Sequence, residues 1–372
     1  MYIQKMQHQQ QHQQYPQHLQ EVSHVKEEPD ITKYQHRNLI NSKYVFKRKI
    51  GKGSFGCIYQ GLNIITQENV AIKYEATTCA QPTLVWESKI LNHLSGIPGV
   101  VKLRYFGTES NKNIIVMDLF SHTLAEEVRK LKKTATRAIF NRKYENGSES
   151  GSECGSENGS ESEIELDEPI YKHYLKNVLK YTITMIEIIE KIHERSVIHR
   201  DIKPENFMIS RLGLQDPQDH EDQQDHEDQE TLKKVNIIDF GLSRIYIKDG
   251  THIPNKQNSS IVGTMRYIST HIHEGNVYSR RDDIISILYV IIYLLKGKLP
   301  WCGLKVESSD KRTKAEIVYE VKKRTSITEL CEGLPAIFER MLTYAYKIGY
   351  DEKPDYIYLK RLCKQELSLY ED

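Results

Sequence analysis

The eight residues His199–Asn206, with the sequence HRDIKPEN, bring four different chemical groups together in a short stretch of chain. The carboxylate of Asp201 can accept a proton from a substrate hydroxyl, and the ammonium of Lys203 can neutralise charge on a moving phosphoryl group. The carboxamide of Asn206 can hold a metal ion. Four groups at fixed spacing are far more specific than an isolated HRD tripeptide, so the segment indicates phosphoryl transfer.

A glycine-rich segment lies well upstream, where Gly51, Gly53 and Gly56 form a GxGxxG pattern. The pattern alone is weak because dinucleotide-binding folds share it, but in those folds the glycines open a helix and an acid follows about 20 residues later. Here β-type residues follow, and Lys73 stands 17 residues after Gly56 in a Val-Ala-Ile-Lys run. The segment therefore predicts a hairpin whose turn covers phosphates, with Lys73 on the next strand, and argues against hydride transfer.

Two further carboxylates complete this set. Lys73 in an apolar strand needs a counter-charge, and Glu87 is the candidate because it lies on the one helix expected nearby, over 83–95. Such an ion pair would place Lys73 on the α- and β-phosphates of a nucleotide, whereas an isolated Glu87 would be a solvated helix residue. Further on, an apolar strand ends in Asp-Phe-Gly, where Asp239 can coordinate Mg²⁺ together with Asn206.

The elements that must position these groups are of two kinds. Short β-type runs surround the single helix in the first part of the chain, at 44–50, 57–62, 69–75, 100–106 and 113–118. Helical periodicity then takes over, with an apolar face over 171–194 and an almost wholly apolar segment over 282–296. We therefore expect an α+β fold with two lobes, a small β-rich lobe at about 44–118 and a large helical lobe at about 122–366. A cleft is expected where they join, near 118–122.

Composition narrows the function further. The 372 residues carry 52 basic and 51 acidic side chains, so the whole chain has no nucleic-acid or membrane signature, although basic clusters lie near 129–143 and 311–324. The six cysteines show no paired spacing, and no apolar run approaches the ~20 residues of a membrane span. These features favour a soluble protein with reduced thiols and without a direct nucleic-acid or membrane partner.

Several segments lack the apolar residues that a packed core needs. They are a Gln/His-rich leader at 1–40 and acidic insertions with tandem repeats at about 145–168 and 214–230. Because such polar segments bury too little apolar surface to offset the entropy lost on ordering, we expect the leader and the insertions to be disordered. The ordered region is expected to be followed by a short tail at 367–372.

In chain order, the GxGxxG, VAIK, helix glutamate, HRDxKxxN and DFG motifs resemble a eukaryotic protein kinase over about 44–366, and Lys203 is typical of serine/threonine kinases. Ordinary kinases carry Ala-Pro-Glu where Ser-Thr-His stands at 269–271 here. That departure, together with SRRDD at 279–283, LPWxGLK at 299–305 and PDYxYL at 354–359, is similar to the casein kinase I family.

The resemblance implies that the chain uses ATP and Mg²⁺, with Asp201 and Lys203 as catalytic residues. It also implies that Asp283 anchors the backbone of the catalytic loop and that Thr264 bonds to Asp201 and Lys203. The nucleotide site would be lined by Ile50, Gly51, Gly53, Gly56, Ile58, Ala71, Lys73, Glu87, Asp118 and Leu119.

Members of the casein kinase I family favour acceptor serines that follow acidic or phosphorylated residues. By resemblance, Arg266 and Lys305 form an anion pocket beside the acceptor site, and Arg244 matches a second basic position. The chain departs from the family at 259–260, where two serines replace a basic residue, and at 121–122, where Ser-His replaces Gly-Pro after the hinge.

The sequence thus predicts a serine/threonine protein kinase of the casein kinase I type that acts on acidic or phospho-primed protein substrates. We expect a monomer in the cytoplasm and nucleus, with roles in DNA repair, trafficking or cell-cycle signalling implied by the family. One alternative, a catalytically weak kinase-fold scaffold that binds acidic partners, is disfavoured because Lys73, Asp201 and Asp239 are all present. The other, a small-molecule kinase, would not need the SRRDD and LPWxGLK motifs or the anion pocket.

Overall fold

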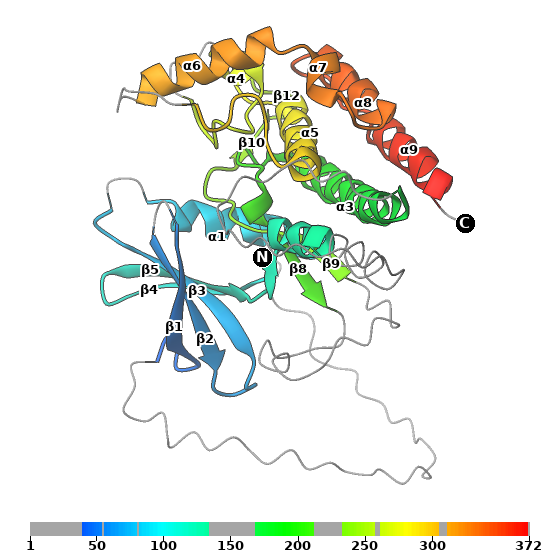
Figure 1. The fold of residues 1–372 in the computed structure, drawn as a ribbon. Helices are drawn as coiled ribbons and strands as arrows, with labels where there is room; N and C mark the ends of the chain where they lie inside the picture. Colours follow the sequence, from blue (N-terminus) through cyan, green and yellow to red (C-terminus); the bar gives the residue numbers. More distant parts are fainter. Residues whose placement is uncertain are drawn as a thin grey trace, which may run out of the picture.

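The structure is a computed structural model that describes residues 39–53, 56–79, 82–133, 168–211, 233–256, 261–304 and 311–370. The expected leader and both acidic insertions fall almost entirely outside these ranges, as do Lys305 and the serines at 259–260. In the described ranges, a strand-rich lobe is followed by a helix-rich lobe, as Figure 1 shows. This is the two-lobed α+β fold that the sequence predicts.

Antiparallel strands form the sheet of the first lobe, in the order β1-β2-β3-β5-β4. Their bounds are Tyr44–Gly53 for β1, Gly56–Asn63 for β2, Asn69–Ala76 for β3, Leu103–Glu109 for β4 and Lys112–Asp118 for β5. Successive side chains of β3 point to opposite faces of the sheet. Val70 and Ile72 belong to a small apolar cluster with residues of β5, whereas Ala71 belongs to the main core. The alternation places Lys73 on the same face as Ala71, toward helix α1 (Leu84–His93).

The strand expected at 100–106 begins only at Leu103, so the prediction is wrong for its first three residues. Val100 instead forms a parallel bridge with Ile237, at the end of β9 (Lys233–Ile237). The backbone N–H of Val101 donates to the carbonyl of Ile237 at 3.1 Å. These residues therefore tie the β-rich lobe to the helical lobe before the chain enters β4.

The helical lobe is built around helices α3 and α5, which lie close to the segments predicted at 171–194 and 282–296. The bounds are Glu168–Glu194 for α3, Thr270–His273 for α4, Arg280–Lys296 for α5, Lys311–Arg324 for α6, Ile327–Cys331 for α7, Ala336–Lys347 for α8 and Tyr356–Leu367 for α9. At the start of α5, the carboxylate of Asp282 accepts the backbone N–H of Ser279 at 2.8 Å, which satisfies one donor at the helix end. Residues 281–292 are all buried, so α5 forms the centre of this lobe.

Short strands and turns connect the helices. The bounds are His122–Thr123 for β6, Val197–Ile198 for β7, Phe207–Arg211 for β8, Arg244–Ile245 for β10, Ile247–Lys248 for β11, Thr251–His252 for β12, Pro204–Asn206 for the 3₁₀ turn η2 and Ser368–Tyr370 for η3. β6, β8 and β9 form one small sheet, while β7 pairs with β10 and β11 with β12. Because β7 ends just before His199 and β9 shortly before Asp239, these strands deliver the segments around both residues to the junction of the lobes.

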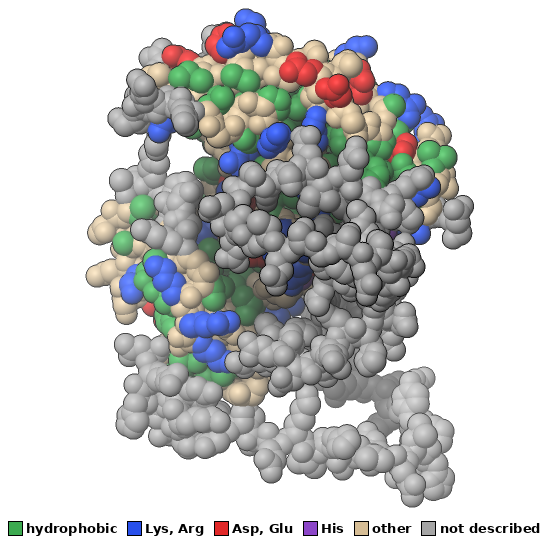
Figure 2. Space-filling view, in the orientation of Figure 1, with side chains coloured by type: hydrophobic (Ala, Val, Ile, Leu, Met, Phe, Trp, Pro, Cys, Tyr) green, Lys and Arg blue, Asp and Glu red, His purple; other side chains and the backbone are tan. Residues whose placement is uncertain are grey.

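The surface carries both signs of charge. On the face shown in Figure 2, Lys and Arg side chains lie on both lobes, and acidic side chains are interspersed over the upper helices. This mixture agrees with the formal net charge of +1. Among the described helices, none has a stretch apolar and long enough to span a bilayer.

Candidate active site

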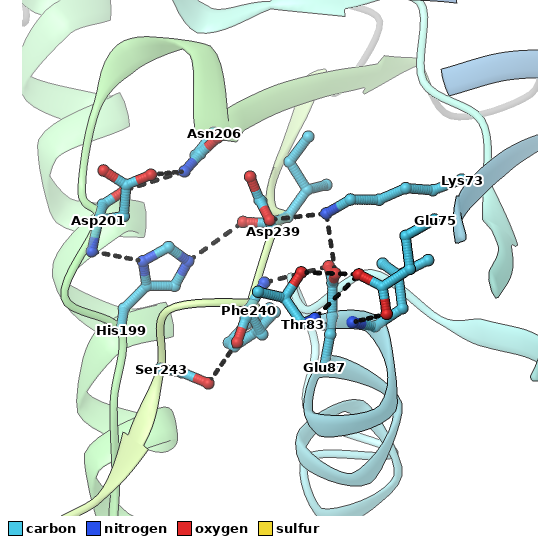
Figure 3. Close-up of polar contacts among 12 residues, drawn as sticks. Lys73, Glu75, Thr83, Glu87, His199, Asp201, Asn206, Asp239, Phe240 and Ser243 are labelled. Carbon is cyan, nitrogen blue, oxygen red and sulfur yellow. Dashed lines mark hydrogen bonds and ion pairs between the residues drawn. The ribbon is translucent and has the colours of Figure 1, made fainter. Parts of the chain in front are cut away.

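Lys73, Glu87 and Asp239 meet where the lobes join (Figure 3). Lys73 Nζ lies 2.8 Å from Glu87 Oε2 on α1 and 2.8 Å from Asp239 Oδ1, beyond the end of β9. Lys73 is 4% exposed and Glu87 is 0% exposed. Although burial acts in the opposite direction, the negative charges of Glu87 and Asp239 raise the pKa of Lys73, and the charge of Lys73 lowers the pKa of Asp239. Lys73 is therefore held as a cation, and the predicted contact between Lys73 and Glu87 is present.

The carboxylate of Asp201 is held on both of its oxygens. Thr264 Oγ1 donates to Asp201 Oδ1 at 2.7 Å, and Lys203 Nζ donates to Asp201 Oδ2 at 2.5 Å. Asn206 Nδ2 donates to the backbone carbonyl of Asp201 at 2.9 Å and to Oδ2 at 3.3 Å. The predicted bond from Thr264 to Asp201 is therefore present. Thr264 and Lys203 meet on opposite oxygens of the same carboxylate.

Asp283 of α5 anchors the catalytic loop, as the resemblance implies. Its Oδ2 accepts the backbone N–H of His199 at 2.7 Å, and its Oδ1 accepts that of Arg200 at 3.0 Å. Arg200 has a φ of 67°, a conformation that is uncommon for a residue other than glycine. Such a backbone persists only where its surroundings hold it, so the two bonds to Asp283 account for the shape of the loop.

His199 joins the catalytic loop to the Asp-Phe-Gly segment. Its Nε2 lies 3.1 Å from the carbonyl oxygen of Ile238, and its ring meets the buried ring of Phe240 edge to face at 4.9 Å. The backbone N–H of Asp201 donates to His199 Nδ1 at 3.3 Å, as Figure 3 shows. Asp201 and Asp239 are therefore positioned through one shared imidazole.

The glycine-rich segment forms the predicted hairpin. Gly53 of β1 pairs with Gly56 of β2, and Ser54 and Phe55 between them lie outside the described residues. A Cβ atom on Gly56 would lie 2.1 Å from the carbonyl oxygen of Tyr74 on β3. Glycine is thus required at this position because the β3 backbone passes too close for a side chain, in addition to any role near phosphates.

The other residues expected around a nucleotide lie on adjoining strands. Ile58 pairs with Gly51 across the hairpin and with Lys73 of β3, and Ala71 pairs with Met117 of β5. Ile50, one residue before Gly51, is 44% exposed.

Asp118 ends β5 and precedes Leu119 at the junction of the lobes. Its side chain is engaged by Arg104 of β4, whose Nε lies 2.6 Å from Asp118 Oδ1. The same guanidinium contacts Glu68 at 2.7 Å. This ion-pair cluster holds the Asp118 carboxylate, and the backbone N–H of Asp118 donates to the carbonyl of Lys102 at 3.3 Å. The role of Asp118 and Leu119 at a nucleotide stays a prediction.

Arg266, one of the expected anion-binding residues, is exposed in the loop before α4. Its guanidinium lies 5.2 Å from the ring centroid of Tyr293 and 5.8 Å from that of Tyr267, within range of cation–π attraction. Across the residues the structure covers, no carboxylate pairs with it. Arg244 lies on β10, paired with Ile198, so the two expected cations sit on different segments. Lys305 lies outside the described residues.

The protein kinase domain family model matches residues 44–149 and 152–346, which is most of the chain. The chain belongs to the protein kinase family. A protein kinase is a phosphotransferase that uses ATP with a divalent cation and acts on protein substrates. The matched residues include the motifs described above, from the glycine-rich hairpin to the segment around Arg266.

The donor set of this kinase fits the divalent cation that accompanies ATP. Such cations prefer oxygen ligands, which the Asp239 carboxylate and the Asn206 amide offer. Because the Asn206 nitrogen donates to Asp201, its amide oxygen is the end left for a cation. Within the ranges that the structure covers, no group of three or more His, Cys, Asp or Glu could hold a metal by itself. A divalent cation such as Mg²⁺ is usually held by one or two side chains together with phosphate oxygens and waters.

Lys322 and Trp301, which the sequence did not place near Arg266, support the loop at 265–268. Lys322 of α6 donates to the carbonyls of Met265 and Ile268 at 2.8 and 2.6 Å, and the Trp301 indole donates to that of Arg266 at 2.8 Å. Lys322 is 4% exposed, although it belongs to a basic helix typical of a solvated surface. Only the LPWxGLK motif, which contains Trp301, gave a signal in the sequence.

Proposed function

We propose that this protein kinase transfers the γ-phosphoryl group of MgATP to serine or threonine in acidic or phospho-primed protein segments, as members of the casein kinase I family do. The observation that carries the proposal is the position of Arg266. Its guanidinium is exposed and rests on two tyrosine rings, and its backbone carbonyl is fixed by Trp301. A cation built in this way suits a phosphate or a carboxylate, because a guanidinium pairs strongly with either.

Asp201 is the proposed base. It accepts the proton of the acceptor hydroxyl as that oxygen attacks the γ-phosphorus, and Thr264 and Lys203 hold its two oxygens in place. Lys203 also lies close enough to Asp201 to stabilise the charge on the phosphoryl group in transit. A lysine two residues after the catalytic aspartate is the feature that supports serine and threonine over tyrosine as acceptors.

Lys73 is the proposed ligand of the α- and β-phosphates, and Glu87 fixes its side chain. Asp239 and the amide oxygen of Asn206 would hold Mg²⁺, which neutralises phosphate charge when it is bound with the nucleotide. The charge of Asp239 is matched by that of Lys73 at 2.8 Å. The proposed phosphate ligand and the proposed cation ligand are thus held next to each other by this contact.

The proposal is tested by offering one peptide in three forms: with a phosphoserine a few residues before the acceptor serine, without it, and with tyrosine as the acceptor. The kinase should label the primed form far better than the unprimed form and should not label tyrosine. Arg266→Ala should reduce kcat/KM for the primed peptide by about 10- to 100-fold, as expected for a lost charge-assisted hydrogen bond. Arg340→Ala, which removes an exposed arginine on α8, is the matched control and should leave kcat/KM unchanged for both serine peptides.

Three results would reject parts of the proposal. Labelling of no peptide would favour the scaffold alternative, and equal labelling of primed and unprimed serine would remove the anion preference. Labelling of tyrosine would overturn the acceptor class.

We also propose that the chain acts as a monomer in the cytoplasm and nucleus, which rests on the family resemblance. Light scattering of the purified chain and imaging of a tagged copy test these two points separately. A dimer in solution, or exclusion from either compartment, would contradict the corresponding part.

A further inference from the structure

Helix α1 touches the activation segment, residues 239–269, through two adjacent side chains. Glu87 Oε1 accepts the backbone N–H of Phe240 at 3.3 Å. The neighbouring Trp86 donates its indole N–H to the carbonyl of Ser243 at 2.8 Å. The residue that pairs with Lys73 is therefore next in sequence to one that holds the activation segment directly.

The two contacts fall at the two ends of one closed turn. The backbone N–H and the hydroxyl of Ser243 both donate to the carbonyl of Phe240, at 3.1 and 2.6 Å, and Figure 3 shows the hydroxyl contact. Phe240 and Ser243 are 0% and 2% exposed. Because the turn is closed by these bonds and both of its ends are buried, the two contacts hold α1 to one short segment that directly follows Asp239.

The start of α1 is fixed from another direction. Glu75 lies two residues after Lys73 on β3, and its carboxylate accepts the backbone N–H groups of Thr83 and Leu84 at 2.9 and 3.1 Å. Glu75 therefore acts as the N-terminal cap that Thr83 itself does not provide. With its N-terminus tied to β3, the remaining freedom of α1 is a swing of its Glu87 side, which the Trp86 bond opposes.

Packing into the core does not account for Trp86. It is 37% exposed, the same fraction as its neighbour Val85, so a smaller residue would serve as well if burial were its role. What distinguishes the indole is a long reach with a hydrogen-bond donor at the end. That donor is the part of the side chain the activation segment uses.

We propose that Trp86 is a positioning residue for phosphoryl transfer, whose indole N–H holds α1 against the turn at Ser243 and so keeps Glu87 on Lys73. The inference rests on the roles proposed above for Lys73 and Glu87. It adds a direct link from the activation segment to the nucleotide side of the site, made by a hydrogen bond that needs no modification of the chain.

Trp86→Phe tests this link, because it keeps an aromatic ring and removes the donor. In the full chain, the substitution should lower kcat by about three- to tenfold, the range of one hydrogen bond, with KM for a peptide substrate unchanged. Val85→Ala, equally exposed and one residue away, is the control and should keep full activity. An unchanged kcat in Trp86→Phe, or an equal loss in Val85→Ala, would overturn the proposal.

A double-mutant cycle with Glu87→Gln separates this inference from the function on which it rests. If Trp86 acts through Glu87, Trp86→Phe should have no further effect on kcat in the Glu87→Gln background. An equal loss in both backgrounds would overturn the role of Trp86. Glu87→Gln alone should reduce kcat, and a failure to do so would refute the proposed role of Glu87, whatever Trp86 does.

Hydrogen exchange distinguishes positioning from general stability. In Trp86→Phe, amides of α1 should exchange faster while those of the buried helix α5 stay protected. Faster exchange in both helices would mean a loss of global stability and would overturn the proposal. The chain has two tryptophans, and Trp301 is 4% exposed. The difference in fluorescence between a protein with Trp86 and the same protein with Trp86→Phe therefore reports on Trp86. A soluble quencher should reach Trp86 more easily in the Glu87→Gln background, where α1 is looser. Equal quenching in both backgrounds would count against the coupling.

Discussion

Thr264 and Asp201 are joined by a 2.7 Å hydrogen bond, although 63 residues separate them in the chain. Thr264 belongs to the activation segment, two residues before Arg266, whereas Asp201 belongs to the catalytic loop. Because the Thr264 hydroxyl occupies one carboxylate oxygen and Lys203 the other, the orientation of Asp201 depends on both segments being in place. The bond therefore links the loop proposed to recognise substrate to the proposed base.

Asp201→Asn should abolish useful turnover. The substitution keeps the size of the side chain and an acceptor for Thr264, but removes the group that takes the proton. A lost general base typically lowers the rate by about 10²- to 10⁴-fold. Transfer of labelled phosphate to a peptide measures the loss. Circular dichroism checks that the variant is folded, because the amide nitrogen of asparagine replaces the oxygen that accepts from Lys203 and Asn206. Substantial activity in a folded variant would show that Asp201 is not the base.

Thr264→Val should lower kcat by about three- to tenfold, since it removes one hydrogen bond to Asp201 while keeping a side chain of similar shape. Thr264→Ser restores the hydroxyl and serves as the matched control. It should recover most of the activity. If valine and serine behaved alike, the hydroxyl would have no part in orienting the carboxylate.

The sequence predicts the parts of this site that have their own side-chain signature. The glycine hairpin, Lys73, Glu87 and the Asp-Phe-Gly strand each have a residue type and spacing that chemistry demands, and their order indicates the two lobes. The contact between Lys73 and Glu87 follows because a lysine in an apolar strand requires a counter-charge. Charge complementarity thus made a long-range contact predictable.

Contacts to backbone carbonyls leave no such signature. Trp86 and Lys322 donate to carbonyls 157 and up to 57 residues away, and any residue could supply those acceptors. The sequence around Lys322 also gives no sign of its burial, because the lysines and arginines of α6 are typical of a solvated helix. The prediction that a strand begins at residue 100 is wrong for a related reason, since β4 begins at Leu103. Residues that bridge to Ile237 of the other lobe are as apolar as strand residues and differ only in their partners.

Lys322→Met should weaken recognition of protein substrate without affecting ATP. The Nζ of Lys322 fixes the carbonyls on both sides of Arg266 and Tyr267, and methionine can fill the same space between Tyr289 and Trp301 without donating. We expect kcat/KM for a primed peptide to fall about tenfold or more, as for two lost hydrogen bonds, with KM for ATP unchanged. Lys323→Met, an exposed neighbour, is the control and should leave both constants unaltered. A parallel change in KM for ATP would indicate a general structural role.

Glu75→Ala should destabilise the β-rich lobe. It leaves the backbone N–H groups of Thr83 and Leu84 without their acceptor, and it also removes the partner of Asn113 Nδ2. Loss of a helix cap typically costs about 0.5–2 kcal/mol, which urea unfolding resolves. The control is Glu194→Ala, at an exposed position near the end of α3, which should change stability little. Equal midpoints for the two variants would show that the cap does not contribute.

The contribution of three histidines to the stability of the chain should fall as the pH drops below about 6.5, the ordinary pKa of histidine. Burial, and then the positive charge of Lys322, lower the pKa of His273 to about 3, and burial also lowers the pKa values of His193 and His271. Below about pH 6.5, these histidines therefore bind protons in the unfolded chain but stay neutral in the folded chain. The contribution of these histidines is therefore complete above about pH 6.5 and is lost progressively below it.

His273→Phe should reduce this pH dependence, because phenylalanine can keep the stacked contact with Tyr319, at 5.6 Å, and does not titrate. The free energy of unfolding of the wild type should drop by up to about 1.4 kcal/mol more than that of the variant between about pH 6.5 and pH 5.5. His173→Phe, at an exposed position on α3, is the matched control and should follow the wild type. Part of the slope should persist in His273→Phe, since His193 and His271 still titrate. Parallel curves for His273→Phe and the wild type would show that His273 accepts a proton in the folded chain, contrary to the effect of its buried position.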